Sequence, residues 1–142
     1  ISMFFMNSGL VPDNLPVLLD PARTPETLHA AAGGSINGQW GILLLYAVYL
    51  FFNIVGEELW WRGYILPRQE LAHGKWTWLV HGVMWTLFHA FRWWELLSIL
   101  PLALLMAYIS CRFKSNWAVT IAHFVGNFAL ATFVIAGVAG AF

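Results

Sequence analysis

The sequence predicts an all-α, polytopic membrane helix bundle with about four transmembrane helices. Two observations lead to this fold class: the composition and the run of apolar stretches. Of the 142 residues, 60% are hydrophobic and 10% are charged, whereas soluble domains are about 45–50% apolar and about 25% charged. The nine Trp residues suit the aromatic belts at membrane surfaces. We therefore expect an integral membrane protein.

We expect the chain to divide near residue 39. Residues 1–39 would hold an apolar tail and a polar, non-cytoplasmic loop, and residues 40–142 the transmembrane core. The tail, residues 1–11, is too short to span a bilayer. Because the chain starts at Ile1 rather than Met, we interpret the tail as the end of a truncated helix in a fragment or processed chain. Thr24 and Pro25 predict a short capped helix that runs through residues 28–32.

Four spanning helices are predicted in the core, over residues 40–66, 76–93, 96–110 and 117–139. Pro67 should end the first helix, because proline cannot donate the helical backbone hydrogen bond. The connecting loops 68–75 and 112–116 are basic and fall on one side if the helices alternate. The positive-inside rule then places both loops in the cytoplasm.

Three ionisable residues, Glu57, Glu58 and Arg62, follow the apolar run of the first helix. A charge at the centre of a spanning helix costs about 2.5–3.5 kcal/mol, so a functional role is the default interpretation. Glu58 and Arg62 are four residues apart and can pair on one helix face. Glu57 points about 100° away from Glu58 and is available for chemistry. The alternative is an interfacial cluster that closes the helix end.

Polar residues recur at helical spacing on two further predicted helices. His81, Trp85 and His89 share one face of the second, and His123 and Asn127 share one face of the fourth. Each residue alone fits a structural role, because His and Asn commonly hydrogen bond between membrane helices. We take His81 as a core or interfacial residue. The groups on three helices together favour a common site.

Composition also excludes some classes of function. The formal net charge is zero, so nothing points to nucleic acid. The single cysteine, Cys111, cannot form an internal disulfide and belongs to no CxxC motif. Membrane lipid is the partner that the composition leads us to expect.

These motifs resemble the CPBP intramembrane proteases, a family that includes the CAAX prenyl endopeptidases and the bacteriocin-processing, abortive-infection proteins. The family pattern is EExxxR, FxxxH and HxxxN on successive core helices. Here the three motifs span Glu57 to Arg62, Trp85 to His89, and His123 to Asn127. Trp85 replaces the usual Phe, which keeps an aromatic wall. The resemblance covers about residues 40–130, and the family usually has further upstream helices.

The resemblance implies peptide-bond hydrolysis inside the membrane. The expected substrate is a peptide or protein, including a lipidated one, and the expected location is a prokaryotic plasma membrane. By motif position, Glu57 would be the general base that activates water and His89 would position that water. His123 and Asn127 would stabilise the oxyanion. The remaining pair, Glu58 and Arg62, would orient the helix. A carboxylate in a low-dielectric site is a competent base near neutral pH, and Asn and His side chains are suitable oxyanion donors.

Two further questions stay open at this stage. Glu57, His89 and His123 would supply a His₂Glu set if zinc were bound, but there is no HExxH motif and Asn127 suits hydrogen bonding better, so no cofactor is favoured. Alternatives to the protease are a non-catalytic scaffold or immunity protein of the same fold, and a transporter or channel. The absence of polar groups from the middle of the third helix counts against a transporter.

Overall fold

A computed structural model describes residues 23–142, and the sequence-predicted tail at residues 1–11 lies outside them. The described chain forms two packing units. The first contains residues 51–124. The second contains the described residues up to Leu50 together with residues 125–142. Helices α3 (Trp40–Glu58) and α7 (Trp117–Val138) each contribute to both units.

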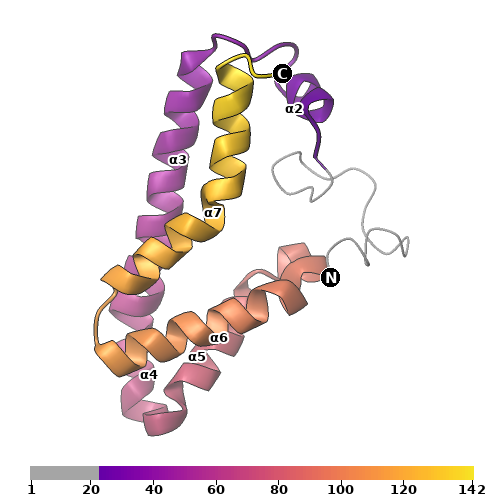
Figure 1. The fold of residues 1–142 in the computed structure, drawn as a ribbon. Helices are drawn as coiled ribbons and strands as arrows, with labels where there is room; N and C mark the ends of the chain where they lie inside the picture. The colour runs from indigo at the N-terminus through magenta and orange to yellow at the C-terminus, as the bar shows by residue number, and fades with distance from the viewer. Residues whose placement is uncertain (1–22) are drawn as a thin grey trace. The chain divides into compact units, whose positions relative to one another are not determined.

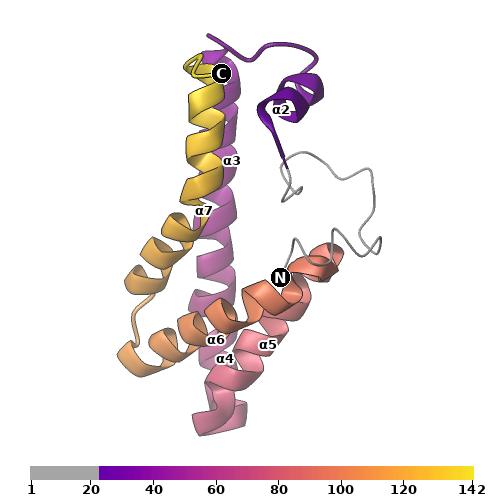
Figure 2. The ribbon, with the colours of Figure 1, turned by 45° about the vertical axis from the view of Figure 1, so that its right-hand side comes forward.

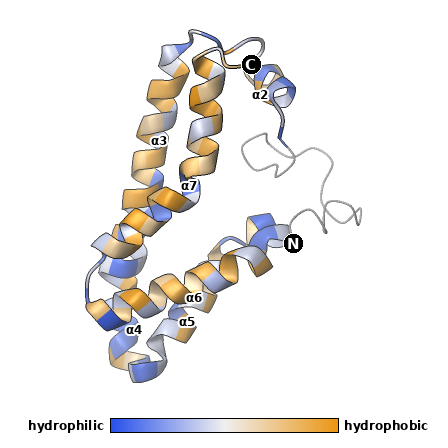
Figure 3. Ribbon diagram, viewed as in Figure 1, coloured by the Kyte–Doolittle hydropathy of each residue, from blue (hydrophilic) through white to orange (hydrophobic). Residues whose placement is uncertain are grey.

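Helices account for almost all of the described chain, which contains no strand. Three helical runs are long and apolar enough to cross a membrane: Trp40–Phe88, Ala90–Phe113 and Trp117–Val138. The first run contains the first predicted helix and the second up to Phe88, joined by a short turn, so the predicted end of the second helix at residue 93 was too late. Most residues of α3, α6 and α7 are apolar, whereas α4 is largely hydrophilic (Figure 3). The polytopic helical fold is therefore confirmed.

The first predicted helix does not end at Pro67, so that prediction was wrong. After α3 the chain continues through a π-helical segment, η1 (Leu59–Ile65), and then α4 (Leu66–His73). The N–H of Leu66 bonds to the carbonyl of Trp61, five residues back. Proline normally clashes with the carbonyl four residues earlier, and the wider π turn places the carbonyls differently. Pro67 is therefore accommodated in the first turn of α4, and most of the predicted 68–75 loop is helical.

The longer helix also brings Glu57 and His89 to comparable distances from the turn that joins their helices. The chain reverses at η2 (Gly74–Trp76) and continues as α5 (Thr77–Phe88). At about 1.5 Å per residue, Glu57 lies about 25 Å before this turn and His89 about 20 Å after it. The two residues therefore reach similar depths.

The remaining helices of the first unit begin near the predicted positions. Between α5 and α6 (Leu96–Phe113) lies a 3₁₀ segment, η3 (Ala90–Glu95), in which the backbone at Arg92 is not helical. The predicted end of the third helix at residue 110 was too early, since α6 extends to Phe113. It stops at Lys114, which has a left-handed backbone (φ 54°). Helix α7 starts at Trp117 as predicted and ends at Val138.

Close packing of α5 against α6 organises the first unit. The two helices run side by side in both views of the ribbon (Figures 1 and 2). A Cβ added at Gly82 of α5 would lie 2.9 Å from the Cα of Leu104 in α6, so only glycine permits this approach. Trp61, Trp85 and Ala103 form a buried cluster beside the contact. This packing fixes the helix that carries Trp85 and His89.

The second unit is held by a small apolar core. Helix α2 (Pro25–Ala31) begins with a capping box between Thr24 and Thr27, which confirms the predicted capped helix. Its Leu28 packs with Ile36 and Val138. The N–H of Gly38 bonds to the carbonyl of Val138 at 2.8 Å. These contacts join the start of α3 to the end of α7.

Candidate active site

Glu57 lies on α3 and is held by two donors. Asn53, one helical turn earlier, donates from Nδ2 to Oε1 at 2.9 Å. The indole Nε1 of Trp85 on α5 donates to Oε2 at 3.2 Å. Glu57 is only half-buried, unlike its neighbour Glu58. Its carboxylate is thus oriented by neighbours and still within reach of a reacting molecule.

Glu58 makes a separate set of contacts on another face of the same helix. Its Oε1 accepts from Nη1 of Arg62 at 3.2 Å and lies 2.8 Å from Nδ1 of His123. Glu58 and Arg62 are each 2% exposed and His123 is 9% exposed. The predicted pairing of Glu58 with Arg62 is therefore present. His123 joins this pair rather than Glu57.

Trp85 connects the two carboxylate groups. Its ring lies 4.5 Å from the guanidinium carbon of Arg62. The rings of His89 and His123 meet it edge-on, with centroids 4.6 Å and 5.8 Å away. Together with its bond to Glu57, these contacts make Trp85 the residue around which the site residues of the first unit gather.

His89 ends α5, where its backbone leaves the helical conformation. Its Nδ1 lies 2.9 Å from the carbonyl oxygen of Trp85. A carbonyl only accepts hydrogen bonds, so Nδ1 carries the proton. In the neutral ring Nε2 is then an acceptor, and it can receive a hydrogen bond from water.

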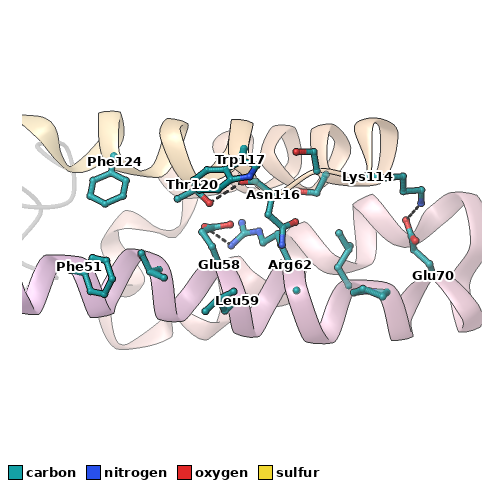
Figure 4. Close-up of a pocket in the computed structure, with 16 residues that line it drawn as sticks. Phe51, Glu58, Leu59, Arg62, Glu70, Lys114, Asn116, Trp117, Thr120 and Phe124 are labelled. Atoms are coloured by element: carbon teal, nitrogen blue, oxygen red, sulfur yellow. Dashed lines mark hydrogen bonds and ion pairs between the residues drawn. The ribbon is translucent and has the colours of Figure 1, made fainter.

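A cavity of about 1000 Å³ opens beside Glu58 and Arg62. Glu58, Leu59 and Arg62 form one wall, and Asn116, Trp117 and Thr120 lie across from them (Figure 4). One end of the cavity carries an ion pair between Glu70 and Lys114, and the other end is apolar, at Phe51 and Phe124. Glu57 and His89 are not among its lining residues.

The two remaining polar residues singled out in the sequence, His81 and Asn127, lie in different surroundings. His81 is fully buried and its Nδ1 lies 2.6 Å from Oε1 of Gln69, which fits the predicted core role. Asn127 lies on α7, four residues after His123, and belongs to the second packing unit. Its part in the site stays a prediction.

The sequence interpretation missed Asn53, which bonds Glu57 directly. Its spacing of four residues from Glu57 was a usable signal, because residues four apart are neighbours on a helix face. The N–H group of Trp85 was also overlooked, because only the aromatic ring was considered. No local spacing links Trp85 to Glu57, so only the fold could show that contact.

The placement of the acidic and imidazole groups also bears on a metal site. Among residues 23–142, no group of three or more His, Cys, Asp or Glu side chains lies close enough together to hold a metal ion. Glu57, His89 and His123 are therefore not gathered closely enough to hold a metal ion in this arrangement.

A protein-family model, described as type II CAAX prenyl endopeptidase Rce1-like, matches residues 39–129. The chain belongs to this Rce1-like family. The match covers well over half of the chain and includes every candidate site residue from Glu57 to Asn127. Comparison with curated proteins and with solved structures gave no match.

Membership of the Rce1-like family agrees with the sequence resemblance to the CPBP proteases. It supports protease activity in general, of the CAAX type and within the membrane. The three apolar helical runs agree with integration into a membrane.

Proposed function

We propose that this Rce1-like protein is an intramembrane endopeptidase in which Glu57 activates water for attack on a peptide bond. The observation that carries the proposal is the gathering of Glu57, His89 and His123 around Trp85. These groups come from α3, the end of α5 and α7. Placing a carboxylate and two imidazoles together in an apolar bundle costs free energy, so a functional role is the default interpretation.

Glu57 is the general base in this proposal. It is the less buried of the two adjacent carboxylates, and its oxygens are oriented by Asn53 and Trp85. Glu58, in contrast, is buried and already engaged by Arg62 and His123. A proton passes from water to Glu57 as the water oxygen attacks the carbonyl carbon, and it is then available for the leaving amine.

His89 positions the attacking water. Because its Nδ1 donates to the carbonyl of Trp85, Nε2 of the neutral ring can accept a hydrogen bond from one O–H of the water while Glu57 removes the proton of the other. His123 and Asn127 stabilise the oxyanion that develops on the carbonyl oxygen. One such donor is worth about 2.7–4 kcal/mol of transition-state stabilisation.

We propose further that the reaction needs no metal ion. The described part of the chain contains no group of three or more His, Cys, Asp or Glu side chains close enough together to hold a metal ion, and Glu57 is already oriented for proton transfer by Asn53 and Trp85. The substrate is a peptide or protein segment that reaches the site within the membrane, and a lipidated C-terminal tail is the first probe to use.

Cleavage of a fluorogenic peptide set by detergent-purified protein tests the proposal. The set includes prenylated and unmodified tails, and wild type is compared with Glu57→Gln, with and without chelator. We expect wild-type cleavage that chelator does not change and that Glu57→Gln abolishes. Glu26→Gln serves as the matched control for purification, since the Glu26 side chain is exposed on α2.

Each other outcome has a definite meaning. Loss of activity with chelator would replace the metal-free mechanism by a zinc site. Equal cleavage by wild type and Glu57→Gln would remove Glu57 from the chemistry. Absence of cleavage by wild type on every tail would favour the non-catalytic scaffold or immunity protein.

A further inference from the structure

The contact between Glu58 and His123 determines where the imidazole carries its proton. Oε1 of Glu58 lies 2.8 Å from Nδ1 of His123. The same oxygen accepts from Arg62 at 3.2 Å. Glu58 and Arg62 form a buried ion pair, and the carboxylate of such a pair can only accept hydrogen bonds. Nδ1 of His123 is therefore a donor.

Glu58 itself has little freedom to move. The side chains of Glu58 and Arg62 are 3% and 0% exposed, and they point toward one another in the wall of the cavity (Figure 4). Arg62 is held in turn by the face of Trp85 at 4.5 Å. The Glu58 carboxylate that contacts His123 is thus held in place by Arg62, and Arg62 is held by Trp85. A bond made by one ring nitrogen sets the orientation and tautomer of the whole imidazole.

We propose that Glu58 is a positioning residue for His123. It holds the ring through Nδ1 and thereby assigns Nε2 to the reacting carbonyl group. This inference rests on the proposed function, in which His123 meets the substrate. A role limited to pairing with Arg62 would leave the orientation of His123 independent of Glu58.

Nitrogen NMR of the intact protein tests the proton placement without any activity. Imidazole ¹⁵N shifts and couplings distinguish protonated from unprotonated ring nitrogens. The chain contains five histidines, so signals are assigned with His123→Gln and His89→Gln. The second assignment is needed because His89 lies within electrostatic range of His123. We expect Nδ1 of His123 to be protonated and hydrogen bonded in wild type. A ring protonated only at Nε2 would overturn the proposal before any variant of Glu58 is made.

Three variants then separate positioning from simple pairing. Glu58→Gln keeps the shape and removes the charge, Glu58→Asp keeps the carboxylate, and Arg62→Lys keeps a cation beside Glu58. We expect Glu58→Gln to lower kcat at least about 10-fold with little change in KM, because replacing a histidine-orienting carboxylate by an amide costs up to about 10⁴-fold in the Ser-His-Asp triad. Glu58→Asp should recover part of the loss.

The Nδ1 signal of His123 should change in Glu58→Gln and persist in Arg62→Lys. If both variants lose the same activity and leave that signal unchanged, Glu58 serves only as a partner for Arg62. The two proposals fail separately. Equal cleavage by wild type and Glu57→Gln overturns the proposed function, whereas the NMR result for His123 decides the positioning role.

Discussion

The indole Nε1 of Trp85 donates a hydrogen bond to Oε2 of Glu57 at 3.2 Å, although 28 residues separate them in the chain. The CPBP motif usually has Phe at the position of Trp85. The Trp side chain keeps the aromatic wall of that motif and adds a donor to the carboxylate proposed as the base. In this protein the second motif therefore contacts the first directly.

Replacement of Trp85 by Phe keeps an aromatic ring and removes the indole N–H donor, so it tests the contribution of the hydrogen bond alone. We expect Trp85→Phe to fold and to lower kcat by about 10-fold or more, since a hydrogen bond to a charged group is worth about 1.5–3 kcal/mol. Steady-state cleavage of the best peptide measures the effect. Trp78→Phe is the matched control, because Trp78 on the same helix contacts Tyr108. Equal turnover in both variants would mean that the indole N–H does not orient Glu57.

Removal of Arg62 should destabilise the protein strongly. Its side chain is fully buried on Glu58, and breaking a buried pair leaves an uncompensated charge, at a cost of about 3–5 kcal/mol. Arg62→Leu should therefore lower the free energy of unfolding in detergent by about that amount. Arg92→Leu is the control, since the side chain of Arg92 is 25% exposed in its pair with Glu95 and such pairs contribute at most about 1 kcal/mol. Similar decreases in the free energy of unfolding of the two variants would contradict a special contribution of the buried pair.

The packing of α5 against α6 predicts that replacing Gly82 lowers the stability of the protein. A Cβ at Gly82 would lie 2.8–3.1 Å from three atoms of Leu104, two of them backbone atoms that cannot rotate away. Gly82→Ala should lower the free energy of unfolding by about 1–3 kcal/mol. Gly126→Ala meets no atom within 4 Å and should be neutral or stabilising, because alanine is the better helix former. An unchanged stability in Gly82→Ala would show that the two helices can separate freely.

The capping box of α2 should control the local stability of that helix. Thr24 Oγ1 accepts from the N–H of Thr27 at 3.3 Å, and Thr27 Oγ1 accepts from the N–H of Thr24 at 2.9 Å. Thr24→Val removes one of these acceptors, and loss of a cap costs about 0.5–2 kcal/mol. We expect faster hydrogen exchange in residues 27–31 and unchanged exchange in α5. Unchanged protection of α2 would mean that its packing, rather than its cap, holds it.

The same helix should respond to acid. A hydrogen bond from Thr24 lowers the pKa of the exposed Glu26 carboxyl below its usual value. A group with a lowered folded-state pKa contributes stability above its unfolded pKa, and this contribution is lost as pH falls through the folded pKa. Protection of α2, corrected for intrinsic exchange, should therefore decrease below about pH 4.3. This decrease in protection should be smaller in Thr24→Val. An equal decrease in wild type and in Thr24→Val would contradict the role of the Thr24 hydrogen bond.

Local signals predicted much of the fold, because they depend on residues that are close in the chain. Apolar runs and composition indicated membrane helices, Thr24 and Pro25 indicated the start of α2, and Trp117 the start of α7. The error at Pro67 has a specific cause. A π turn removes the conflict between proline and the preceding carbonyl, and no feature of the sequence at residues 59–65 was interpreted as that turn.

The sequence by itself determined that Glu57 and Glu58 point in different directions, because adjacent residues on a helix are about 100° apart. It also determined the pairing of Glu58 with Arg62, since four residues bring two side chains onto one face. The tertiary structure alone decided what each carboxylate meets. Glu57 meets Trp85 and Glu58 meets His123, 28 and 65 residues away. Such contacts depend on where the chain reverses and how closely α5 and α6 pack, which are properties of the folded chain rather than of any local motif.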